Sequence, residues 1–165
     1  MDADKEILDG FVVESREHLN EVEDELLEVE KQTGPPDAES INNIFRGIHT
    51  INGGAGFLGL DKVNLLSHTM ETLLSMVRSN ELTPDPPVVD ALLTGVDLLR
   101  TMIDNVENQH MTDIADIVLK LDQLISHNVS PEVQTNLRAQ VTLVNENGRE
   151  AGFTINEFQL NTFRE

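Results

Sequence analysis

Cysteine is absent from the 165 residues, basic residues are scarce, and long apolar runs are missing. Without cysteine, the chain has no disulfides, thiolate metal ligands or thiol nucleophiles. Only 11 Lys and Arg residues stand against 30 Asp and Glu residues, which gives a formal net charge of −19. This charge argues against binding to a nucleic acid or to an anionic membrane surface.

Two further absences concern the membrane. No run of about 18 apolar residues is available for a membrane span, so no membrane insertion is expected. The first residues are acidic and lack the apolar core of a signal peptide. A cytoplasmic location is therefore the expectation.

Amphipathic helical patterns fill the first three quarters of the chain. Apolar residues recur every three or four positions in five segments, at about 4–32, 37–53, 61–77, 86–106 and 112–126. Four long amphipathic helices with short connections predict an all-α fold, an antiparallel up-and-down four-helix bundle. The fifth, shorter helix is expected to cap or flank it. Asp85 and Thr112 are the expected N-caps of the last two helices.

The pattern changes after Pro131. Residues 140–155 alternate between apolar and polar around Asn147-Gly148, which is typical of a β-hairpin. An isolated hairpin is only marginally stable. We therefore predict a helical bundle over 1–127, followed by a linker or tail over 128–165 with a candidate hairpin at 140–155.

The segment IHTINGGAGFLG, residues 48–59, combines a histidine with several glycines in a helical pattern. On a helical wheel His49 lies beside polar or small residues, including Arg46 and Gly53, next to the apolar stripe. His49 is therefore expected at the boundary of the core, facing outward. Gly53 and Gly54, about one turn later, remove side chains and clear an approach for another protein.

A second polar stripe is predicted on the third helix, formed by Asn64, His68, Glu71 and Ser75. If the second and third helices pack antiparallel, the two polar stripes lie side by side. Glu71 or His68 can then accept a hydrogen bond from one ring nitrogen of His49. Such a bond fixes the tautomer and leaves the other nitrogen free as a nucleophile or a ligand.

Residues 42–78 closely resemble the histidine phosphotransfer (Hpt) domain at the N-terminus of CheA-type chemotaxis histidine kinases. The family pattern is roughly I-F-R-x-x-H-[ST]-x-K-G-G-[AS]-x-x-x-G, followed by a helix with H-x-x-E. The matching residues are Ile44, Phe45, Arg46, His49, Thr50, Gly53, Gly54, Ala55, Gly59, His68 and Glu71. The five-helix layout of the first 127 or so residues also agrees with this family.

The resemblance implies a role for each matching residue. His49 is the phosphorylated residue, expected at Nε2, Glu71 holds Nδ1–H, and His68 is an auxiliary member of the same network. Gly53 and Gly54 give access to partners. A separate histidine kinase catalytic domain would supply ATP and Mg²⁺, and an aspartate of a response-regulator receiver domain would take the phosphoryl group. No cofactor is expected in this chain, which would not catalyse alone.

One position departs from the family pattern. Where the family usually has a lysine, three residues after the histidine, this chain has Asn52. A lysine would attract phosphate as a point charge, whereas asparagine offers only a hydrogen bond. Arg46, one turn before His49, is a candidate phosphate contact that could partly substitute for it.

The resemblance favours the N-terminal part of a CheA-like kinase. The alternatives are a standalone Hpt protein of a phosphorelay and a helical docking domain that is never phosphorylated. A self-sufficient enzyme has little support, because no glycine-rich phosphate loop follows a strand. A metal site of His49, His68 and Glu71 would differ from di-iron bundles, which use paired Glu-x-x-His motifs. His18, His110 and His127 receive no role.

Overall fold

The computed structural model describes residues 2–126, and every regular element in this range is helical. The elements are α1 (Asp2–Lys31), α2 (Ala38–Leu58), α3 (Asp61–Arg78), α4 (Pro86–Asp104), the short 3-10 helix η1 (Val106–Met111) and α5 (Ala115–Ser126). The predicted all-α fold is therefore confirmed. The candidate hairpin at 140–155 and the rest of the predicted tail lie outside the described residues.

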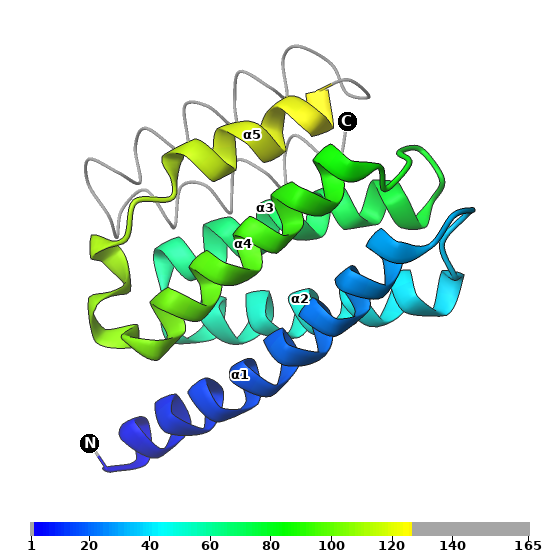
Figure 1. The fold of residues 1–165 in the computed structure, drawn as a ribbon. Helices are drawn as coiled ribbons and strands as arrows, with labels where there is room; N and C mark the ends of the chain where they lie inside the picture. The colour runs from blue at the N-terminus through cyan, green and yellow to red at the C-terminus, as the bar shows by residue number, and fades with distance from the viewer. Residues whose placement is uncertain (1, 127–165) are drawn as a thin grey trace.

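The four long helices form a closed antiparallel bundle (Figure 1). Helix α1 packs against α2 and α4, and α3 completes the ring by packing against the same two helices. Helix α5 contacts α3 and α4 and lies on the side of the bundle away from α1. This is the predicted four-helix bundle with a flanking fifth helix.

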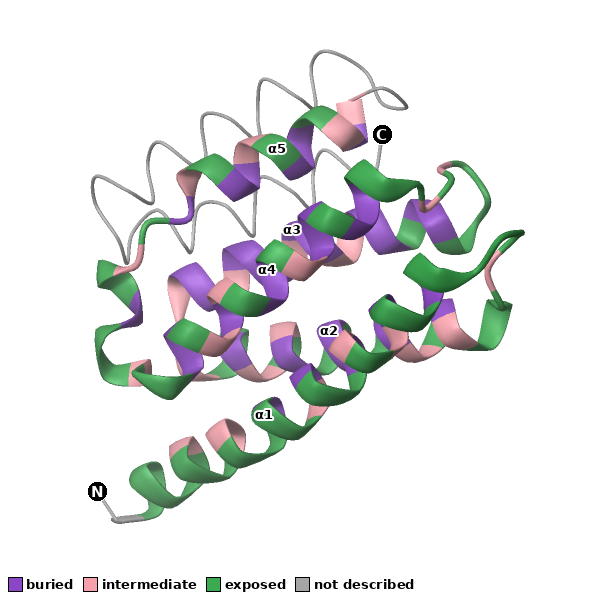
Figure 2. Cartoon of the chain, viewed as in Figure 1, coloured by how far each residue is buried: buried purple, intermediate pink, exposed green. Residues whose placement is uncertain are grey.

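One apolar core runs through the bundle, formed by the inward faces of the helices (Figure 2). The first turns of α1 are mostly exposed, and Phe11 and Val12 are only partly buried. Helix α1 has 30 residues, whereas α2 has 21 and α4 has 19. At about 1.5 Å per residue, α1 is too long for its neighbours to cover both of its ends.

Helix α2 runs past its predicted end at Gly53 and stops at Leu58. The glycines do not end it, because tertiary packing outweighs their low helix propensity. A Cβ on Gly54 would come within 2.7 Å of the Phe11 ring, so α1 and α2 approach closely there. The helix ends at Gly59, whose φ of 71° is the left-handed conformation common at helix C-termini.

The helix caps after α3 are partly as predicted. Asp85 caps α4, where its carboxylate accepts a hydrogen bond from the Val88 backbone N–H. Thr112 was predicted to cap α5, and this prediction is wrong. Thr112 instead ends η1, and the Asp113 carboxylate accepts a hydrogen bond from the backbone N–H of Ala115 at 3.0 Å. The Thr112 carbonyl accepts a hydrogen bond from Lys62 Nζ and thereby ties η1 to α3.

Candidate functional site

His49 lies in the middle of α2, between the buried residues Ile48 and Ile51. These two isoleucines hold that stretch of the helix against the core. The His49 side chain itself is 63% exposed. The predicted outward-facing position is confirmed, and the ring can be reached from solvent.

Glu71 of α3 accepts the hydrogen bond of His49, since Nδ1 lies 2.8 Å from Glu71 Oε1. Sequence reasoning left the choice between Glu71 and His68 open, and the structure selects Glu71. An ionised carboxylate can only accept, so Nδ1 must carry the proton. In the neutral ring the lone pair is then on Nε2, which can act as a nucleophile or a ligand.

Asn52 extends the network on the far side of Glu71. Its Nδ2 donates to Glu71 Oε2 at 2.9 Å, and its Oδ1 accepts from Asn64 Nδ2 at 2.7 Å. Both carboxylate oxygens of Glu71 therefore have a partner, one on each side. Asn52 thus supplies a hydrogen-bond donor to Glu71 without adding a positive charge next to it.

An aromatic and cationic stack lies beside the same histidine. The rings of Phe45 and His49 are nearly parallel, with an interplanar angle of 9° and a centroid separation of 5.9 Å. The guanidinium carbon of Arg78 lies 3.9 Å from the centroid of the Phe45 ring. Phe45 entered the sequence analysis only as a residue of the family pattern, although its position one turn before His49 was a signal for this contact. Nothing local in the sequence pointed to Arg78.

His68, the predicted auxiliary residue, lies on α3 about one turn from Glu71. Burial lowers its pKa from the ordinary value of 6.5, and the negative charge of Glu71 opposes that shift. His68 is therefore mainly neutral at pH 7. His68 lies close enough to Glu71 for the carboxylate charge to act on its pKa. Its participation in the chemistry stays a prediction.

The lowered pKa of His68 makes folding stability depend on pH. Below pH 6.5 the unfolded chain binds a proton at this residue more readily than the folded chain, so stability is lost as pH falls. Between pH 7.5 and pH 5, we expect the wild type to lose stability relative to His68→Gln as the pH falls. The change in the difference between their unfolding free energies is at most about 1.4 kcal/mol per pH unit. Urea titrations at several pH values measure it, and a constant difference would refute the prediction.

The other predicted residues are spread around His49. Arg46 donates to Asn43 Oδ1 at 2.7 Å and lines a groove between α1 and α2, so its contact with phosphate stays a prediction. Gly53 is exposed and has open space where a Cβ would be. Gly54 instead faces Phe11, and a side chain at this position would clash with the Phe11 ring. Partner access through either glycine stays a prediction.

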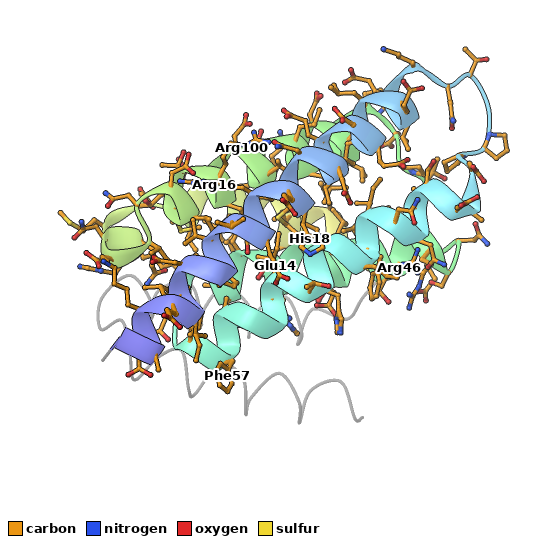
Figure 3. All side chains as sticks on the ribbon, turned by 90° about the horizontal axis from the view of Figure 1, so that it is seen from below. Glu14, Arg16, His18, Arg46, Phe57 and Arg100 are labelled. Carbon is orange, nitrogen blue, oxygen red and sulfur yellow. The ribbon has the colours of Figure 1, made fainter. Side chains whose placement is uncertain are left out.

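A second groove lies between the N-terminal half of α1 and the C-terminal half of α2, with a volume of about 770 Å³. In Figure 3, Glu14 and His18 of α1 lie next to α2, and Phe57 projects from the end of α2. Phe57 is 81% exposed. Thr50, the residue after His49, lines this groove and the neighbouring one. Thr50 is adjacent to His49 in the chain, and His49 itself lines neither groove.

Two further features concern metal binding and the membrane, within residues 2–126. No group of three or more His, Cys, Asp or Glu side chains is arranged to hold a metal ion in this part of the chain. Within the same range, no helix is long and apolar enough to span a membrane.

Comparison with known proteins identifies the family. Residues 6–109 match the family model of the Hpt domain. The chain belongs to the Hpt domain family. The Hpt match covers α1 to α4 and includes His49, Glu71 and Arg78.

The relatives of this Hpt domain include chemotaxis proteins. It is 34% identical to the chemotaxis protein CheA of Listeria monocytogenes over 138 residues, which are 82% of this chain and 21% of that protein. It is 42% identical to CheA of Rhizobium meliloti over 94 residues, 57% of this chain and 12% of that protein. The chain thus spans about a fifth or less of the length of these relatives.

A solved structure gives the same result. The phosphorylated P1 domain of CheA3 from R. sphaeroides, in complex with CheY6, superposes with a TM-score of 0.67 at 26% identity. The match covers 75% of this chain and 98% of that one. The fold is therefore that of the CheA P1 domain.

Proposed function

We propose that His49 accepts a phosphoryl group from ATP at Nε2 and passes it to an aspartate of a response-regulator receiver domain. The observation that carries this proposal is the exposed imidazole whose Nδ1 is held by Glu71 at 2.8 Å. The Hpt family match and the phosphorylated state of the similar P1 domain support it.

The chemistry uses the two ring nitrogens differently. The Nε2 lone pair attacks the γ-phosphorus of ATP, the bond from that phosphorus to the bridging oxygen breaks, and ADP leaves. The phosphorylated ring carries a positive charge and keeps the proton on Nδ1. Glu71 stabilises that charge at hydrogen-bond distance. Attack by the receiver's aspartate oxygen then breaks the N–P bond and returns the neutral ring.

The proposed partners are those of the CheA proteins that this chain resembles. A histidine kinase catalytic domain holds ATP and Mg²⁺, and the Hpt domain supplies only the acceptor. Since the relatives are CheA proteins of which this chain matches about a fifth, we propose that it is the N-terminal part of a CheA-like kinase. The alternative is a standalone phosphorelay protein. The reaction is placed in the cytoplasm, where ATP is available.

The direct experiment is a phosphorylation assay. The chain is incubated with Mg-ATP and the catalytic core of a CheA-type kinase, and the label is tested for stability in acid and in base. Label that is lost in acid and retained in base supports phosphohistidine. No label with an active, matched kinase would contradict the proposal and favour the interpretation as a docking domain.

The second groove, between the N-terminal half of α1 and the C-terminal half of α2, is the proposed docking face for the receiver domain. Its lining includes Thr50, the residue after His49, and the apolar side chains of Phe11 and Phe57. The similar P1 domain was solved with CheY6 bound.

Phe57→Ser is expected to weaken transfer from the phosphorylated chain to its receiver about 10-fold, as loss of a central aromatic contact does at other interfaces. Labelling of His49 by the kinase should stay within twofold of wild type. Met111→Ser is the matched control, because Met111 is 75% exposed on η1 and lies outside the groove. Equal transfer rates for the two variants would show that the receiver docks elsewhere.

A further inference from the structure

The hydrogen bond to Glu71 fixes His49 at one atom only. A ring held at Nδ1 can still tilt about the hydrogen-bond axis, and such a tilt moves the direction of the Nε2 lone pair. Transfer of a phosphoryl group requires the attacking lone pair, the phosphorus and the leaving oxygen to be nearly in line. A second contact that sets the plane of the ring therefore has a direct chemical use.

Phe45 provides a contact of that kind. It lies four residues before His49 on α2, and residues four apart are neighbours on one face of a helix. The two ring planes are within 9° of each other, at a centroid distance inside the range of offset stacking. Phe45 is only partly buried, so its ring also needs to be held.

Arg78 holds the Phe45 ring from α3. Its guanidinium carbon lies 3.9 Å from the ring centroid, within the roughly 6 Å range of cation–π contacts. Arg78 is in the last turn of α3, seven residues after Glu71, and so lies two turns along the same face. Helix α3 therefore meets the His49 site at two points, directly through Glu71 and indirectly through Arg78.

We propose that Phe45 and Arg78 are positioning residues of the His49 site: the Phe45 ring sets the plane of the imidazole, and the Arg78 guanidinium holds Phe45. This inference rests on the proposed phosphoryl transfer at His49. It assigns Arg78 no contact with the phosphoryl group. Its effect passes through Phe45, so removing Arg78 should change little once Phe45 is gone.

A double-mutant cycle tests this coupling. Phe45→Leu, Arg78→Met and the double variant are phosphorylated by the same kinase catalytic core, and kcat and KM are measured for each. We expect kcat to fall about 10-fold for Phe45→Leu and about threefold for Arg78→Met, within the range that misplacing a reacting group produces. KM should stay within twofold. The double variant should match Phe45→Leu, because residues in contact show non-additive effects.

Two conservative variants and one control separate positioning from general destabilisation. Phe45→Tyr keeps the ring and Arg78→Lys keeps the cation, so both should recover most of the wild-type kcat. Arg100→Met removes an arginine of the α1–α4 contact, where it pairs with Glu23, and should leave kcat unchanged. Circular dichroism checks that each variant is folded.

NMR relaxation of the His49 ring gives a readout that needs no kinase. The ring should become more mobile in both variants, and the increase should be larger in Phe45→Leu than in Arg78→Met. Equal ring mobility in all variants, a wild-type kcat for Phe45→Leu, or additive effects in the double variant would overturn the inference. If the wild type itself takes no label from an active kinase, the proposed function fails, and ring mobility still decides whether the stack orients His49.

Discussion

Replacing His49 with glutamine (His49→Gln) is expected to reduce phosphorylation of the chain to background while the bundle stays folded. Glutamine has no imidazole nitrogen, so no nucleophile remains at this position. The side chain is 63% exposed and sits on the outside of α2, so little packing is lost. The measurement is labelling from Mg-ATP by a CheA-type catalytic core, with folding followed by circular dichroism.

The other histidines serve as internal controls for this result. His18 and His110 lie on α1 and η1, and their replacement by glutamine should leave labelling within twofold of wild type. Acid-labile label that persists in His49→Gln would show that the phosphoryl group resides elsewhere. A variant that has lost helical signal would be replaced by His49→Asn, for which the same outcomes apply.

Glu71→Ala is expected to lower the phosphorylation rate about 10- to 100-fold. Carboxylates that orient metal-bound histidines have effects of this size, and Glu71 has the equivalent position on Nδ1. Without it, the ring can adopt either tautomer, and the positive charge that forms on phosphorylation loses its counter-charge. Single-turnover labelling with saturating kinase core measures the chemical step directly.

Asn52→Leu tests the contribution of one carboxylate oxygen of Glu71 apart from the other. Asn52 donates to Oε2 and His49 to Oε1, so this variant frees one side of the carboxylate and leaves the bond to His49. Its rate should lie between those of wild type and Glu71→Ala. Glu81→Ala is the matched control, since it removes a carboxylate just beyond the end of α3 that accepts a hydrogen bond from Ser79. A rate for Glu71→Ala equal to this control would contradict the assigned role of Glu71.

The bundle and the pairing of His49 with Glu71 were accessible from the sequence because both follow from periodic patterns. Apolar stripes every three or four residues define faces, and antiparallel packing of two such faces brings their polar edges together. His49, Glu71 and His68 lie on those edges, so the spacing predicts a hydrogen bond from His49 to Glu71 or His68. The spacing alone does not choose between them, because the choice depends on the rotation of α3 about its axis. The family resemblance named Glu71.

Features that depend on distant parts of the chain were not accessible in the same way. The glycines after His49 indicated a helix end, yet α2 continues because Gly54 packs against Phe11 of α1. Thr112 looked like a cap, but its carbonyl is used by Lys62 and the capping falls to Asp113. The contact between Phe45 and Arg78 joins residues 33 positions apart in the chain, on two different helices.

Locating the phosphoryl group at atomic level tests the proposal most directly. The chain, labelled with ¹⁵N in its histidine rings, is phosphorylated by the kinase core, and coupling between ³¹P and ring nitrogens is recorded by NMR. The proposal predicts one phosphoryl group, bound to Nε2 of His49, with the proton on Nδ1 facing Glu71. Coupling to Nδ1, or to a ring nitrogen of any other histidine, would contradict it.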